Sequence, residues 1–104
     1  MGQCIRFIKT SELYLTEVLD IDHVDFDLGY DRFDRLTDTM ARVGFFIPYY
    51  DNDLGYCNAL PSDYVSGKLT ECEAIANIDE DLKSYLSEMK ILSLDGYVMI
   101  TFCN

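Results

Sequence analysis

Aspartates and apolar residues are combined in the stretch from residue 20 to residue 38, DIDHVDFDLGYDRFDRLTD. This combination limits the possible folds of the chain more than any other feature of the sequence. It holds seven aspartates but only two basic residues, Arg32 and Arg35. Phe26 and Phe33 stand among the charges, whereas a disordered acidic segment has low hydrophobicity and few aromatic residues. The stretch therefore predicts a folded surface that displays negative charge.

The second half of the stretch has the periodicity of a helix. Its apolar residues recur at spacings of three, four and three: Phe33, Leu36, Met40 and Val43. This stripe predicts an amphipathic helix over residues 32–43 with its apolar side in the core. Asp31 suits the N-cap, and Gly44 suits the position just after the last turn.

Three segments have the pattern of strands. Residues 3–9 and 97–103 are rich in β-branched and aromatic side chains. Residues 24–28 alternate apolar side chains with Asp25 and Asp27, which predicts a short strand or extended loop with an acidic outer face.

A second helix is predicted over residues 78–90, with Asn77 as its N-cap and three acidic residues in its first turn. The core of the fold should contain apolar residues from both helices and the last strand: Phe33, Leu36, Leu82, Leu86, Ile100 and Phe102. Substitution of these residues should lower stability.

The remaining segments are less regular. Residues 11–19 fit either a short helix or a strand. Residues 45–50 predict a strand in which Pro48 restricts ladder pairing and points to an edge. Residues 51–67 are rich in turn formers and predict the longest loop, and residues 68–76 predict a further strand.

This order of elements predicts the α+β class, with an antiparallel sheet and two helices packed on one face. A split β-α-β (ferredoxin-like) arrangement with an insertion after the first strand matches the order. A chain of 104 residues has the size of one domain, here residues 1–104.

The charge excludes several classes of function. Eight basic residues against nineteen acidic ones give a net charge of −11, which disfavours direct binding of nucleic acid or of an anionic membrane surface. The N-terminal residues lack the apolar region of a signal peptide, and no apolar run is long enough to span a bilayer. We expect a cytoplasmic protein.

The candidate catalytic and metal-binding residues do not form a recognisable motif. The four cysteines, widely separated, are expected to be reduced and buried: Cys4, Cys57, Cys72 and Cys103. In the split arrangement the first and last of them lie on neighbouring strands. Loops starting at Asp20 or Asp51 break the calcium-binding EF-hand pattern, and His23, the only histidine, has no cysteine near it in sequence. We therefore predict no metal, no cofactor and no enzymatic activity.

Tyrosines and aspartates are the residues that best fit a binding surface. Tyrosine buries a large area at low entropic cost, and carboxylates complement a basic partner. The predicted partner-binding residues come from the acidic stretch and the long loop: Asp22, Asp25, Asp27, Tyr30, Asp34, Tyr50, Asp51, Asp53 and Tyr56. The alternative is that some of the tyrosines close the core and the aspartates only keep the rim solvated.

Size, charge and this pattern favour a small inhibitor that binds and neutralises a basic nucleic-acid enzyme. The leading hypothesis is an immunity protein or antitoxin against a cognate nuclease toxin. The alternative is a phage-encoded DNA-mimic inhibitor of a host defence nuclease, similar in role to anti-CRISPR proteins. A third hypothesis, from a different class, is a small enzyme or metal-binding domain.

Overall fold

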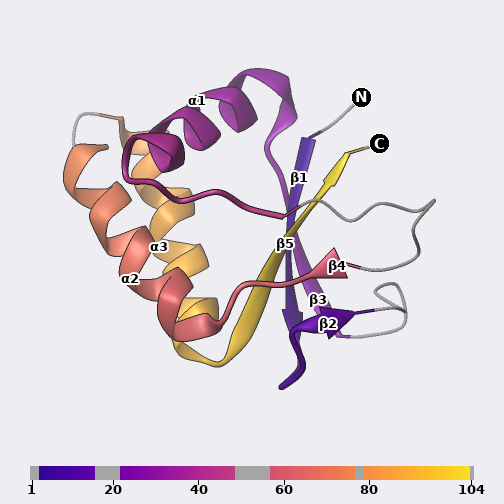
Figure 1. Cartoon of the computed structure of the whole chain (residues 1–104). Helices are drawn as coiled ribbons and strands as arrows, with labels where there is room; N and C mark the ends of the chain where they lie inside the picture. Colours follow the sequence, from indigo (N-terminus) through magenta and orange to yellow (C-terminus); the bar gives the residue numbers. More distant parts are fainter. Residues whose placement is uncertain (1–2, 16–21, 49–56, 77–78, 104) are drawn as a thin grey trace.

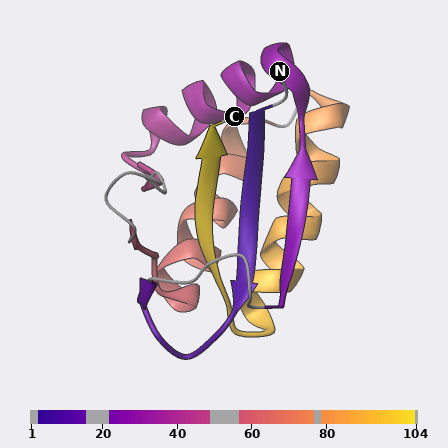
Figure 2. The ribbon, with the colours of Figure 1, turned by 90° about the vertical axis from the view of Figure 1, so that its right-hand side faces the viewer.

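The N-terminal strand β1 (Gln3–Lys9) lies at the centre of a three-stranded antiparallel sheet, between β3 (His23–Asp27) and β5 (Tyr97–Cys103), as the elements labelled in Figure 1 and the turned view of Figure 2 show. The computed structural model describes the whole chain except residues 1–2, 16–21, 49–56, 77–78 and 104. The strands predicted over residues 3–9 and 97–103 are confirmed at both ends.

Alternation along β1 divides the core between the two faces of the sheet. Ile5 and Phe7 are fully buried in the larger cluster, which includes side chains from the helices. Ile8 points to the opposite face and packs in a smaller cluster with Leu15 and Ala59. Both faces of the central strand are therefore covered, as its mostly apolar sequence requires.

Three helices cover one face of the sheet: α1 (Gly29–Arg42), α2 (Ser62–Ile75) and α3 (Glu80–Leu94). Helices α2 and α3 lie side by side, to the left of the strands in Figure 1 and behind them in Figure 2, and α1 crosses one end of the sheet. Within the described ranges, none of the helices combines the length and apolarity needed to cross a bilayer.

The expected number of helices was wrong, because residues 68–75 belong to α2 and do not form a strand. Their buried side chains, together with Val65 and Ala76, recur at helical spacings of four, three and four: Val65, Leu69, Cys72 and Ala76. This stripe starts inside the segment that was predicted as a loop. The predicted boundary between loop and strand at residue 68 separated Val65 from the rest of the stripe, so the helical period was missed.

The ferredoxin-like split arrangement is not seen among the described residues, whose main sheet has three strands in the order β3-β1-β5. Residues 45–48, predicted as part of a strand, lie outside regular structure. Pro48 nevertheless accepts hydrogen bonds from the backbone N and Oγ1 of Thr101, at 3.2 and 2.8 Å, which hold this segment beside β5.

A two-stranded ribbon of β2 (Tyr14–Leu15) and β4 (Cys57–Asn58) supplies the smaller cluster on the other face. The undecided segment 11–19 thus contributes a short strand at Tyr14–Leu15. The part of that segment from residue 16 onward lies outside the described residues.

The helices begin at other residues than predicted. Helix α1 starts at Gly29, and its N-cap is Leu28, which makes no side-chain cap hydrogen bond, so Asp31 lies in the first turn instead. In α3 the N-cap is Asp79, whose carboxylate accepts a hydrogen bond from the backbone N of Leu82. The predicted cap, Asn77, lies outside the described residues.

Candidate functional site

The structure describes five of the nine predicted partner-binding residues, and all five are exposed: Asp22, Asp25, Asp27, Tyr30 and Asp34. The four from the long loop lie outside the described residues: Tyr50, Asp51, Asp53 and Tyr56. Strand β3 runs into α1 through Leu28, so the acidic stretch spans a sheet edge and a helix. It therefore contributes to two distinct surfaces.

Asp25 is engaged in the fold itself. Its two carboxylate oxygens accept hydrogen bonds from Nε and Nη2 of Arg6, at 2.5 and 2.7 Å. Arg6 is only 8% exposed, and the register of β1 against β3 places the two residues directly opposite each other. The hydrogen bonds from Arg6 hold the pKa of Asp25 below its usual value, because they favour the ionised carboxylate. Asp25 thus stabilises a buried guanidinium.

Asp27 is different, because its carboxylate has no hydrogen-bond or ion-pair partner among the described residues. It lies at the exposed end of β3, opposite Cys4 in the register.

Burial, and then the negative charge of Asp25, raise the pKa of Cys4 to about 11. Burial also raises the pKa of Cys72 to about 11. Both thiols are therefore protonated at neutral pH and poor nucleophiles.

A groove of about 440 Å³ runs between the edge of β3 and helix α3. Its apolar lining includes Val24 and Phe26 from the strand and Ile91 and Leu92 from the helix. Val24 is 37% exposed and Ile91 is 64% exposed, although both are apolar. No pattern in the sequence predicts this groove, because Val24 and Ile91, on its two sides, are 67 residues apart in the chain.

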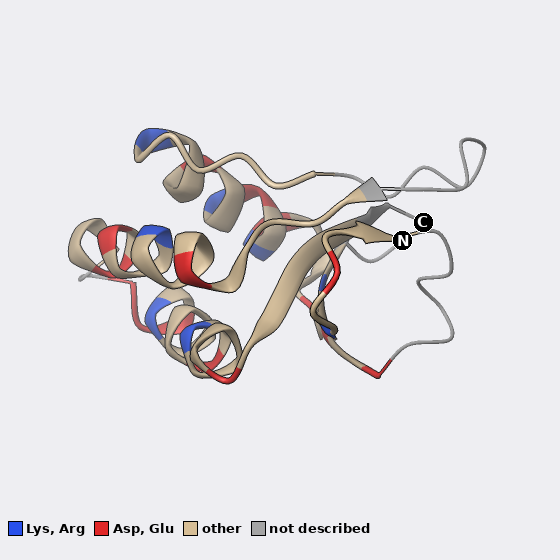
Figure 3. Cartoon of the chain, turned by 60° about the horizontal axis from the view of Figure 1, so that its bottom comes forward, with Lys and Arg blue, Asp and Glu red and all other residues tan. Residues whose placement is uncertain are grey.

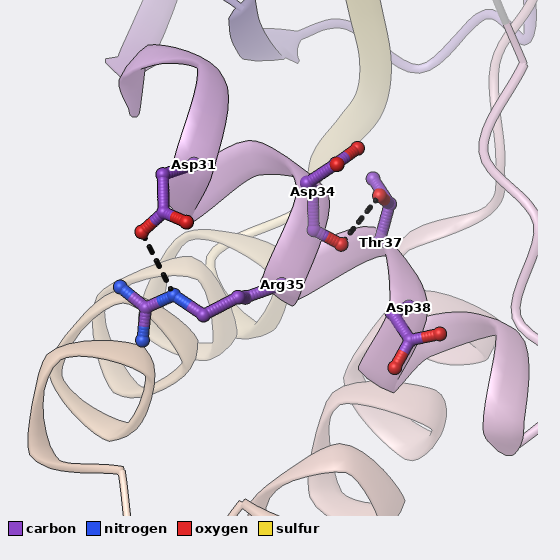
Figure 4. Close-up of a pocket in the computed structure, with 5 residues that line it drawn as sticks. All are labelled: Asp31, Asp34, Arg35, Thr37 and Asp38. Atoms are coloured by element: carbon purple, nitrogen blue, oxygen red, sulfur yellow. Dashed lines mark hydrogen bonds and ion pairs between the residues drawn. The ribbon is translucent and has the colours of Figure 1, made fainter.

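The second surface is the outer side of α1, where an open hollow of about 540 Å³ has three aspartates in its lining: Asp31, Asp34 and Asp38 (Figure 4). Spacings of three and four residues place these aspartates on one side of the helix. Figure 4 shows Arg35 reaching towards Asp31 and away from Asp34.

Ion pairs neutralise part of this row of aspartates. Arg35 donates to Asp31 at 3.2 Å and to Asp79 at 2.5 Å, and Arg42 lies 3.4 Å from Asp38. The carboxylate of Asp34 has no such partner among the described residues, since only its backbone oxygen accepts a hydrogen bond, from Thr37. Asp34 is therefore the free negative charge at the centre of the row.

Two of the described tyrosines, Tyr30 and Tyr85, lie in different surroundings. Tyr30 is 70% exposed in the first turn of α1, beside a hollow that Asp81 also lines. Tyr85 packs edge-to-face on Phe26 and accepts a hydrogen bond from Arg32 at 3.0 Å. Of these two, Tyr30 has the exposure of a binding residue, whereas Tyr85 belongs to the scaffold.

Acidic residues are spread over all three helices and β3, with basic residues among them (Figure 3). Within the described part of the chain, no group of three or more His, Cys, Asp or Glu residues is placed to hold a metal ion. No protein-family model matches the chain, and no significant match was found among curated proteins or solved structures. The function proposed below therefore depends on the chemistry and placement of the residues themselves.

Proposed function

We propose that this protein is a small cytoplasmic inhibitor that binds and neutralises a basic nucleic-acid enzyme, as an immunity protein or antitoxin does with its cognate nuclease toxin. The observation that carries the proposal is the row of carboxylates on the open side of α1, formed by Asp31, Asp34 and Asp38. The row belongs to a chain with a net charge of −11.

The physical basis is electrostatic complementarity. The cleft of a nuclease must attract phosphates, so it presents Lys and Arg side chains. A row of carboxylates about 5–6 Å apart on a rigid helix can occupy such a cleft in place of the substrate. Opposite charges also accelerate the encounter and exclude acidic partners. In this proposal Asp34 inserts deepest, because no arginine of its own chain has to be displaced first.

The regular spacing of the same row also supports a second candidate, a phage-encoded DNA mimic that blocks a host defence nuclease, as anti-CRISPR proteins do. The two candidates share their physics and differ in genetics, because an immunity gene lies next to the gene of its toxin. An enzyme or metal-binding domain is less favoured, since the described cysteines Cys4 and Cys72 have pKa values of about 11. An enzyme would also show turnover without a partner.

The test uses the product of the neighbouring reading frame. We expect it to cleave RNA or DNA, and we expect an equimolar amount of this protein to abolish the cleavage. The triple variant D31N/D34N/D38N should weaken inhibition at least about tenfold, because truncating charges that are buried at an interface raises the off-rate. Its matched control, E12Q/E71Q/D95N, changes the net charge equally at exposed residues outside the row.

Equal weakening of inhibition in the two triple variants would show that only net charge matters, and no weakening in either would show that these charges do not matter. Both results would remove α1 from the proposal. A neighbouring product without nuclease activity would contradict the immunity role. In that case, inhibition of a defence nuclease from the host becomes the deciding measurement for the DNA-mimic candidate.

A further inference from the structure

We propose that the outer edge of β3 is a docking site at which an extended segment of the partner protein adds as a fourth, antiparallel strand, with basic and apolar residues alternating along it. This inference rests on the proposed function only in taking the partner to be basic. It concerns a surface separate from the row of aspartates on α1.

The two edges of the sheet differ in whether other described parts of the chain cover them. Along β5, the outer edge is covered by other parts of the chain, since Leu60 forms a bridge with Met99 and Pro48 accepts hydrogen bonds from Thr101. Strand β3 pairs with β1 on one side only, and no described segment pairs with its other side. Figure 2 shows β3 at this edge with α3 behind it.

The register shows which backbone groups face outward. The backbone N of Lys9 donates to the carbonyl of Asp22 at 2.9 Å, so these residues form a hydrogen-bonded pair. Hydrogen-bonded and non-hydrogen-bonded pairs alternate along an antiparallel ladder. The backbone groups of Asp25 and Asp27 therefore point away from β1, where an added strand can pair with them.

The side chains of an added strand would alternate between two environments. Those on the helix side would enter the groove and cover Val24 and Ile91, the partly exposed apolar residues of its lining. Those on the opposite side would lie beside Asp25 and Asp27. Pairing by the backbone with pockets for alternate side chains is the usual mode of strand addition.

Charge identifies the occupant as basic. Asp27 and Glu88 line the groove, and neither carboxylate has an ion-pair partner among the described residues. Asp25 is already bound to Arg6, so it adds little free charge. The edge thus combines an apolar lining with two free carboxylates, which complement a segment of alternating Lys or Arg and apolar residues.

A second copy of this chain is the wrong occupant. Pairing β3 with itself would place Asp25 or Asp27 opposite acidic residues of the other copy, and like charges directly opposite each other destabilise a sheet. The net charge of −11 on each copy adds to the repulsion. Charged edge strands commonly protect proteins from self-association in this way.

The experiment titrates the intact protein with a capped seven-residue peptide, Lys-Val-Lys-Val-Lys-Val-Lys, and follows binding by calorimetry and by NMR amide shifts. We expect saturable binding with shifts concentrated at His23–Asp27 and on α3. A peptide of the same composition with its lysines and valines in separate blocks should bind at least about fivefold more weakly, because it cannot match both sides of the edge. Equal binding of the two peptides would overturn the proposal, because charge alone would then explain it.

Backbone methylation gives the sharpest control, since it changes no charge. In antiparallel addition the lysines face Asp25 and Asp27, so their N–H groups point at β3 and those of the valines point away. N-methylation of two lysines should therefore weaken binding at least about tenfold, and N-methylation of two valines less than about twofold. Weaker binding after N-methylation of the valines alone would overturn antiparallel addition, because the valine N–H groups point at β3 only if the added strand is parallel. Equal weakening of binding by the two methylated peptides, or no weakening by either, would overturn the proposed strand addition.

Two variants separate this site from the proposed function. I91S removes apolar surface from the groove, and L94S removes a comparable side chain that is 70% exposed on the same helix outside it. Only I91S should weaken peptide binding, by at least about threefold. If the wild-type protein inhibits the nuclease but does not bind the peptide, the docking site is wrong and the proposed function stands. If the peptide binds at β3 but no nuclease is inhibited, the docking site stands and the proposed function is wrong.

Discussion

At the scale of single residues, Arg6 and Asp25 show how a charge in the acidic stretch serves the fold. We expect Asp25→Ala to lower the free energy of unfolding by about 1–3 kcal/mol, because it leaves the guanidinium of Arg6 buried without its carboxylate partner. Asp27→Ala, a change on the same strand at a residue whose carboxylate has no partner in the described part of the chain, should alter it by less than about 0.5 kcal/mol. Urea denaturation at pH 7 measures both. Equal losses would show that the ion pair adds nothing.

The pH dependence of the same pair has a definite sign. Because the pKa of Asp25 is lowered in the folded state, its contribution is present above the unfolded pKa of about 3.9 and is lost as the pH falls through the lower folded value. The stability difference between the wild type and Asp25→Ala should therefore persist at pH 5 and shrink below about pH 4. A difference that grows in acid would contradict this assignment.

The thiols give a second prediction at this scale. Cys4 and Cys72 have pKa values raised to about 11, chiefly by burial, so almost no thiolate is present at neutral pH. We expect iodoacetamide to modify neither residue in the folded protein within the time needed to alkylate free cysteine, and to modify both in urea. Peptide mass spectrometry reads out each site. Rapid labelling of Cys4 in the folded protein would show a reactive thiol and would favour the enzyme hypothesis.

At the scale of elements, two glycines should respond in opposite directions to the same substitution. Gly29 opens α1 with a φ of +71°, a conformation that costs an L-residue about 1–2 kcal/mol, so Gly29→Ala should destabilise the protein. Gly67 lies inside α2 with ordinary φ and open space around its Cβ position, so Gly67→Ala should stabilise it by about 0.5–1 kcal/mol. Thermal and urea unfolding measure the signs, and two changes of the same sign would refute the argument.

Gly29 also explains why α1 begins earlier than its apolar stripe. Its positive φ turns the chain directly from β3 into the helix, so α1 begins at Gly29 and Asp31 lies in the first turn. Negative charge in the first turn still interacts favourably with the helix dipole. The stripe itself was predicted correctly, since Phe33 and Leu36 are buried.

At the scale of the whole molecule, the charge of −11 makes a prediction that is independent of the site. We expect no binding to duplex or single-stranded DNA at physiological salt, because the basic residues are few and at least five of them are already held in ion pairs: Arg6, Arg35, Arg42, Lys68 and Lys90. A gel shift with both nucleic acids measures this. Micromolar binding in either assay would contradict the prediction.

The sequence alone determined the features that depend on local pattern. The periods of residues 3–9, 97–103 and 33–43 predicted two strands and the stripe of α1, because side chains that share a face recur at a fixed interval. Five of the six predicted core residues are buried, and the side chain of Phe102 lies outside the described part. Exposure of the acidic stretch followed from its charge.

Tertiary structure alone decided what depends on pairing between distant segments. The register of β1 against β3 gave Asp25 its partner Arg6, and the position of β3 at the sheet edge brought Val24 beside Ile91 of α3. Local periodicity predicts neither contact, because it describes only residues that are near each other in the sequence. Each of these contacts joins two segments that are far apart in the sequence. The same acidic stretch thus contributes Asp25 to an ion pair with Arg6, one side of the groove beside α3, and the row of aspartates on α1.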